Sequence, residues 1–202
     1  GMIRAAAKNN AFVAVVTDPG DYELIMREMG DNDGTTSLDL RRRLAHQAYA
    51  RTAAYDAAIA AWFADERGET FPARHALGGE LRQTLRYGEN PHQPAAFYPS
   101  QGLGEPPSGL AAAQQHGGKA LSFNNYLDLD AALRFCRSFI GPEWAQWPHC
   151  CVIIKHTNAC GVALSTDQIS SWDDALASDP ESAFGCVIAF NTPVSMKTAE
   201  RI

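Results

Sequence analysis

The sequence predicts an α/β fold, and the last third of the chain indicates it most clearly. Two continuous apolar runs, at 150–154 and 186–190, are typical of strands that are covered on both faces. A helical pattern from about residue 168 to 177 separates the two runs. Strand, helix and strand at this spacing predict a βαβ unit, with two parallel strands joined by a right-handed crossover.

The rest of the chain also mixes the two periodicities. We expect a buried strand at 12–16, a short helix at 22–29, and a long helix that Ser37 caps and Gly68 ends. Three arginines at 41–43 are interpreted as a solvated face of that long helix. Further patterns predict strands at 81–87 and 95–98, a surface loop at 99–109, and helices at 129–136 and from 196 onward.

Composition limits the classes of partner. The 202 residues include 17 Lys and Arg against 23 Asp and Glu, a net charge of −6, so an anionic substrate must be met by local cations. No apolar run approaches the ~20 residues of a membrane span, and no basic run indicates nucleic-acid binding. Five cysteines without a CxxC pair are typical of reduced thiols, and we expect a cytoplasmic protein.

The two ends of the sequence indicate a fragment. Gly1 before Met2 is typical of a tag remnant, and the helical pattern after residue 196 stops without a capping signal. We therefore expect the chain to belong to something longer.

The densest group of reactive side chains follows the first apolar run. Lys155 and His156 begin the loop after that strand, and Asn191 follows the second strand, so all three are expected at carboxyl ends of the sheet, where ligands bind. His156 can move a proton near neutral pH, and Lys155 can donate one or stabilise negative charge. A structural histidine is the alternative interpretation.

Two other kinds of site use the same loop. His156 and Cys160, with cysteines from the strands, could surround zinc, but neighbouring strand residues point to opposite faces. Cys160 and His156 could instead form a nucleophilic pair, for which the sequence offers no third, orienting group. We expect no metal site.

A second polar group lies at 86–93. Arg86, at the end of a predicted strand and before a turn with Gly88 and Pro91, can present its planar guanidinium to a phosphate. Pairing of Arg86 with a local carboxylate is the alternative.

Taken together, these segments resemble one family, the bifunctional purine biosynthesis enzymes that join an AICAR transformylase to an IMP cyclohydrolase. The segments are RYG at 86–88, NPHQ at 90–93, GKALSFNNYLD at 118–128, KHTNACG at 155–161 and DPESAFG at 179–185. The opening RAAAKN at 4–9 resembles a later part of the cyclohydrolase domain. The resemblance implies the end of that domain at 1–78 and the start of a cytidine-deaminase-like transformylase domain at 79–202.

The resemblance also implies roles for individual residues. His156 would be the general base and Lys155 its acid or electrostatic partner in formyl transfer from 10-formyltetrahydrofolate to AICAR, and Lys8 matches a catalytic lysine of the cyclohydrolase. The residues implied to bind the substrate are Arg86, Tyr87, Asn158 and Gly185. The family pattern further implies a homodimer with composite sites.

This sequence departs from the family pattern at two positions. Ala159 stands where proline is usual, and Cys186 stands where glycine is common, which adds a side chain near the expected nucleotide site. Because much of both domains lies outside the sequence, we expect little or no turnover by this chain alone. A non-catalytic module for purine-nucleotide binding or assembly is the alternative function.

Overall fold

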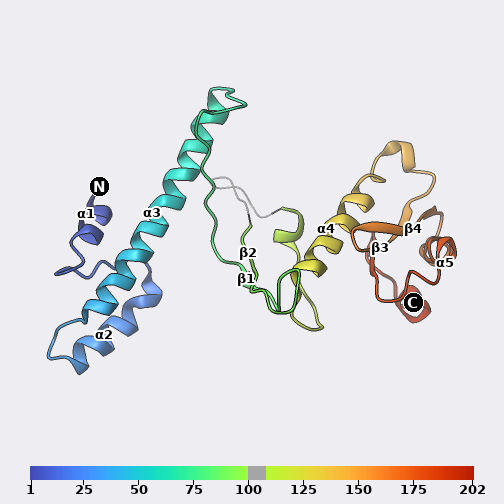
Figure 1. The fold of residues 1–202 in the computed structure, drawn as a ribbon. Helices are drawn as coiled ribbons and strands as arrows, with labels where there is room; N and C mark the ends of the chain where they lie inside the picture. Colours follow the sequence, from blue (N-terminus) through green and yellow to red (C-terminus); the bar gives the residue numbers. More distant parts are fainter. Residues whose placement is uncertain (100–107) are drawn as a thin grey trace. The chain divides into compact units, whose positions relative to one another are not determined.

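The computed structural model describes residues 1–99 and 108–202, which form two compact units (Figure 1). The first unit is Gly1–Glu80, and the second contains Leu81–Pro99 together with 108–202. The surface loop expected at 99–109 lies almost wholly outside the described residues. Among those residues, no helix combines the length and the hydropathy that a membrane span requires.

The first unit is helical. Its helices are α1 (Met2–Lys8), α2 (Tyr22–Asp31) and the long α3 (Leu38–Glu66), with a short 3-10 turn, η1 (Pro19–Asp21). The Ser37 hydroxyl accepts the Leu40 N–H at 3.1 Å, as a capping residue should, and Gly68 beyond the far end of α3 adopts a φ of +63°. The helix predictions for this region are confirmed.

The strand predicted at 12–16 is wrong. This segment has no secondary structure; Phe12 is 85% exposed and only Val15 is buried, in a small core with Ala7, Ala45 and Ala48. A β-branched apolar run becomes a strand only when another strand pairs with it, and here α1 and α3 provide the packing instead.

The three arginines at 41–43 differ from one another. Arg42 and Arg43 are exposed, as expected of a solvated face, whereas Arg41 is half-buried. Its guanidinium donates to the backbone carbonyls of Asn10, Ala11 and Thr36. The interpretation as a solvated face is therefore wrong for Arg41, which ties two loops to α3.

The second unit begins with a small hairpin. Strands β1 (Gln83–Thr84) and β2 (Ala96–Phe97) pair antiparallel and are shorter than predicted. The 3-10 turn η2 (Gly109–Ala112) and helix α4 (Phe123–Arg137) follow, and Ser122 and Asn125 form a reciprocal capping box at the start of α4. A further 3-10 turn, η3 (Pro142–Trp144), precedes the main sheet.

The main sheet has three strands in the order β4-β3-β5. They are β3 (His149–Lys155), β4 (Asn158–Ser165) and β5 (Val187–Phe190), with helix α5 (Gln168–Ser178) between β4 and β5 and the short α6 (Met196–Arg201) after them. Both β4 and β5 run antiparallel to the central β3. The chain is mixed α/β, as predicted, but the parallel pairing of 150–154 with 186–190 is wrong.

The cause is β4, a strand that was not predicted from the sequence. A tight turn after β3 sends the chain back as β4, so that α5 connects β4 to β5, which are parallel to each other on either side of β3. Asn191, which follows β5, therefore lies at the start of β3, where its side-chain oxygen accepts the Cys150 N–H at 2.9 Å. It lies at the opposite end of β3 from Lys155.

The core of the second unit lies on both faces of β3, as its continuous apolar run predicts. Alternate residues Cys150, Val152 and Ile154 pack against α4, and all are fully buried. Cys151 and Ile153 point to the other face, where Trp172 and Ala175 of α5 cover them. The sheet and its two helices thus hold the loop after β3 on a rigid base.

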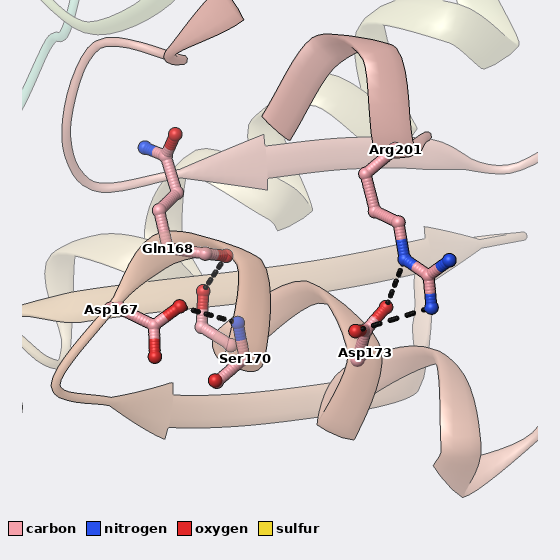
Figure 2. Close-up of polar contacts among 6 residues, drawn as sticks. Asp167, Gln168, Ser170, Asp173 and Arg201 are labelled. Atoms are coloured by element: carbon pink, nitrogen blue, oxygen red, sulfur yellow. Dashed lines mark hydrogen bonds and ion pairs between the residues drawn. The ribbon is translucent and has the colours of Figure 1, made fainter. Parts of the chain in front are cut away.

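The start of α5 provides a stability test (Figure 2). The Asp167 carboxylate accepts the Ser170 N–H at 2.9 Å, and hydrogen bonds from Ser170 hold the pKa of this exposed carboxyl below its usual range. A lowered pKa in the folded state stabilises the protein above the ordinary pKa of about 4, and this contribution is lost as the pH falls through the folded-state value. Asp167→Ala should lower the melting temperature at pH 7, and the difference from the unchanged protein should shrink at acid pH.

Asp167→Asn is the matched control, because the amide oxygen can still cap the helix but does not titrate in this range. Melting temperatures measured from pH 2.5 to 7 should place Asp167→Asn between Asp167→Ala and the unchanged protein at neutral pH, because the amide keeps the cap but lacks the charge, and the difference between Asn and the unchanged protein should disappear at acid pH. A loss with Ala that is the same at every pH would contradict a role for the charge.

Candidate functional site

Lys155 and His156 lie at the tip of the β3–β4 hairpin. Lys155 pairs with Asn158 across the two strands, which leaves only His156 and Thr157 in the turn. Their φ angles are +52° and +64°, the left-handed values of a type I′ hairpin turn. Glycine and asparagine are the usual residues there, and a β-branched threonine at positive φ is uncommon. Such backbone strain is typical of functional sites.

Hydrogen bonds from three side chains hold the turn. The Asp128 carboxylate, from α4, accepts the Thr157 N–H at 2.7 Å. The carbonyl of His156 accepts the Asn158 side-chain amide at 2.9 Å and the Thr157 hydroxyl at 2.6 Å. His156 itself is exposed, so its imidazole is accessible to a ligand while its backbone is fixed.

Lys155 reaches the segment before β5. Its ammonium donates to the Phe184 carbonyl at 3.0 Å, next to the exposed Gly185 with a φ of +76°. Hydrogen bonds from Ser182 hold the pKa of Asp179 below its usual range, and the charge of Lys155 contributes in the same direction. The KHTNACG and DPESAFG segments therefore lie together, although β3 and β5 do not run parallel.

Arg86 and Tyr87 form a second group, in which Arg86 is exposed and Tyr87 is half-buried. The Arg86 guanidinium lies 4.8 Å over the Tyr87 ring and donates to its hydroxyl at 3.2 Å. Backbone hydrogen bonds from Arg86 N–H to Leu121 and from Phe123 N–H to Tyr87 fix this segment beside the start of α4. The Arg86 contacts in the described residues are thus aromatic, and the alternative of a local carboxylate partner is not what the structure shows.

Helix α4 contacts both groups. The Asn124 side-chain amide donates to the Glu89 carbonyl at 3.0 Å, and Asp128, one turn later, binds the Thr157 N–H. Residues at i and i+4 share one helix face, so the Arg86 loop and the His156 turn are both attached to the same side of α4. Lys8 belongs to the other unit, where it is the exposed last residue of α1.

No role for Asn124 or Asp128 was predicted from the sequence. Both lie within the GKALSFNNYLD segment, on a helix that buries Ala132 and Cys136. Their spacing of four residues was the feature of the sequence that could have indicated a shared role. That spacing shows a shared polar face, but not which loops the face contacts.

The cysteines lie in apolar surroundings. Cys160 and Cys186 pack in the cluster under α5 with Trp172, and burial raises the pKa of Cys186. Burial also raises the pKa of Cys151 to about 12, with a smaller effect of Cys150. The packing of Cys160 in this apolar cluster is typical of a structural cysteine and does not favour a nucleophilic role. In the described parts of the chain, no three His, Cys, Asp or Glu residues gather as metal ligands would.

A cavity of about 850 Å³ lies elsewhere in the second unit. Residues of β1, β2, η2 and the segment before α4 line it, together with Tyr126 and Leu129 from another face of α4. None of the predicted site residues lines this cavity. The volume of the cavity alone would therefore suggest a different site from the one formed by the titratable side chains.

A histidine in a strained turn with a lysine next to it, and an exposed arginine on a second loop attached to the same helix, together form the candidate functional site. The chain belongs to the AICARFT/IMPCHase bienzyme family, whose model matches residues 6–202. This membership confirms the family resemblance of the sequence.

Its curated relatives include proteins named bifunctional purine biosynthesis protein PurH. Those of Ruegeria pomeroyi, Parvibaculum lavamentivorans and Caulobacter vibrioides are 51%, 52% and 50% identical to this chain. The matches cover 100%, 100% and 98% of this chain, but only 37%, 36% and 36% of the relatives. The chain thus spans little more than a third of their length.

Proposed function

We propose that this chain is a central segment of a bifunctional enzyme of purine biosynthesis that formylates AICAR and then closes the product to IMP. Residues 1–78 would be the end of the cyclohydrolase domain and residues 79–202 the start of the transformylase domain. Family membership and the share of the relatives that is covered support this proposal. The two compact units divide at Glu80, close to the proposed boundary.

The observation that carries the proposed chemistry is the fixed turn, which contains His156 and directly follows Lys155 at the end of β3. In formyl transfer, the 5-amino nitrogen of AICAR attacks the formyl carbon of 10-formyltetrahydrofolate, and a new C–N bond forms. His156 accepts the proton that this nitrogen loses. The bond from the formyl carbon to N10 of the folate then breaks, and N10 takes up a proton.

Lys155 contributes charge at this step. Its ammonium is held by the Phe184 carbonyl, close to the turn, where it can stabilise the oxyanion that develops on the formyl group or supply the proton for the leaving nitrogen. An amine conjugated with a carboxamide is a weak nucleophile, which is why a base at His156 is useful.

The other polar groups of the site are proposed to bind the nucleotide. Arg86 offers a planar fork for the phosphate, and Tyr87, which stacks under it, limits its movement. Asn158 and the open backbone at Gly185 lie beside the turn and complete the proposed nucleotide site. We propose no resident metal, because the steps above need only proton transfer and fixed charge.

Lys8 is proposed to act in the second reaction, in which the formylated product closes its ring and loses water. It lies in the first unit, as the proposed assignment of 1–78 to the cyclohydrolase requires. A homodimer with composite sites is also part of the proposal, on the family pattern.

Calorimetric titration of the chain with AICAR tests the nucleotide site. We expect saturable binding that Arg86→Ala and Lys155→Ala each weaken by about tenfold, as for loss of one charge-assisted hydrogen bond of about 1.5 kcal/mol. Arg137→Ala, which removes an exposed cation at the far end of α4, is the control and should bind like the unchanged chain. Equal effects of all three substitutions would mean that only overall charge matters.

Formyl transfer separates the proposed function from a non-catalytic module. Turnover is expected only when the remaining parts of both domains are supplied in trans, and His156→Ala should then lower kcat by about 10²-fold or more. Binding of AICAR without turnover under those conditions would favour the nucleotide-binding module instead.

A further inference from the structure

We propose that Asp128 and Asn124 of α4 are positioning residues, each of which holds one half of the site described above. Asp128 fixes the His156 turn and Asn124 fixes the Arg86 loop. The proposal rests on the proposed function, because it assigns these residues to the same site.

Asp128 provides what the hairpin itself lacks. In a two-residue turn the N–H of the second turn residue points away from the strand pairing, and here the Asp128 carboxylate accepts it at 2.7 Å. A non-glycine residue in the left-handed region is strained, and the turn contains two of them. A hydrogen bond to a carboxylate is among the stronger ones in proteins and can hold one of these residues in place.

Asn124 acts in the same way on the other loop. Its amide donates to Glu89, three residues after Arg86, in a segment that Gly88 and Gln93 close by a backbone hydrogen bond of 2.7 Å. The helix that carries both side chains is itself fixed, since its start has a capping box and its second half is buried against β3.

Exposure argues for a local role rather than one in the core. Asn124 is exposed and Asp128 is half-buried, so neither contributes to the two apolar clusters of the sheet. Loss of either side chain should therefore change the loop that it holds much more than the unfolding free energy of the unit.

Three variants test the proposal: Asp128→Ala, Asp128→Asn and Asn124→Ala. Amide hydrogen exchange at Thr157, followed by NMR on the complete chain, should become about tenfold faster with Asp128→Ala. Asp128→Asn retains an acceptor oxygen and should restore most of the protection. Asn124→Ala should leave Thr157 unchanged.

The functional readouts should divide between the two residues. Asn124→Ala should raise the Kd for AICAR several-fold, whereas Asp128→Ala should mainly lower kcat of the complemented enzyme, with little change in KM. All three variants should unfold in urea close to the unchanged chain. A role in general stability would instead lower the urea midpoint and change both functional readouts together.

Two results would overturn the proposal. One is an amide exchange rate of Thr157 that does not change in Asp128→Ala, and the other is an exchange rate in Asp128→Asn as high as that in Asp128→Ala. If the unchanged chain does not bind AICAR, the proposed function fails at that point. The exchange of Thr157 still decides whether Asp128 holds the turn, so the two failures are distinguishable.

Discussion

Gly161→Ala should destabilise the second unit by about 3 kcal/mol, the upper part of the usual range for an overpacked core. Gly161 lies on β4 under α5, and a Cβ built there would be 1.9 Å from the Ala175 carbonyl oxygen and 2.8 Å from its carbon. Both are backbone atoms, so no side chain can turn aside to make room. The helix must move away from the sheet, which loosens the packing of Trp172 and Ala175 against β3.

Urea denaturation monitored by circular dichroism measures this loss, and hydrogen exchange on α5 localises it. The control is Gly117→Ala, in the same unit, where a Cβ meets nothing within 4 Å and φ is not in the left-handed region. Gly117→Ala should change the unfolding free energy by less than about 0.5 kcal/mol. Equal effects of the two substitutions would contradict close packing at Gly161.

The two ends of the KHTNACG segment, residues 155–161, are constrained for different reasons. Lys155 and His156, at the start of the segment, have side chains that can take part in proton transfer. Gly161, at its end, must be glycine because the backbone of α5 leaves no room for a Cβ. Between them, Cys160 is the extra residue of an irregularity in the β3–β4 pairing, opposite Ile153 and Ile154. One short segment thus has both a proposed catalytic and a structural constraint.

The sequence could predict which residues form strand β3, but not the direction of its partners. A buried central strand needs only an apolar run, and the run at 150–154 is fully buried as expected. The hairpin was missed because its turn contains His156 and Thr157 in place of the asparagine and glycine that usually indicate a type I′ turn. The proposed function and the usual chemistry of a type I′ turn require different residues at this point, which is where reasoning from local sequence is expected to fail.

The candidate site was predictable in part for a similar reason. Lys155 and His156 were placed at the end of a buried strand from the sequence alone. That the Gly185 segment lies beside Lys155, and that α4 contacts both loops, depends on hydrogen bonds between residues about 30 positions apart along the chain. Local periodicity contains no information on such pairings.

Arg41→Ala should destabilise the first unit by about 2 kcal/mol, the value for loss of hydrogen bonds from a charged donor in a partly exposed position. The guanidinium donates to Asn10 at 3.1 Å and to Ala11 at 3.0 Å, and also to Thr36 in the loop before α3. Those carbonyls belong to segments without regular secondary structure, so few other groups can replace the donor.

Arg42→Ala is the matched control, since it removes the same charge one position along α3 from an exposed side chain. We expect it to change the unfolding free energy by less than about 0.5 kcal/mol. Arg41→Lys should restore only part of the lost unfolding free energy. The guanidinium reaches several carbonyls with different nitrogens, and a single ammonium cannot replace all of these donors. Equal losses for Arg41→Ala and Arg42→Ala would show that net charge, and not this set of hydrogen bonds, stabilises the start of α3.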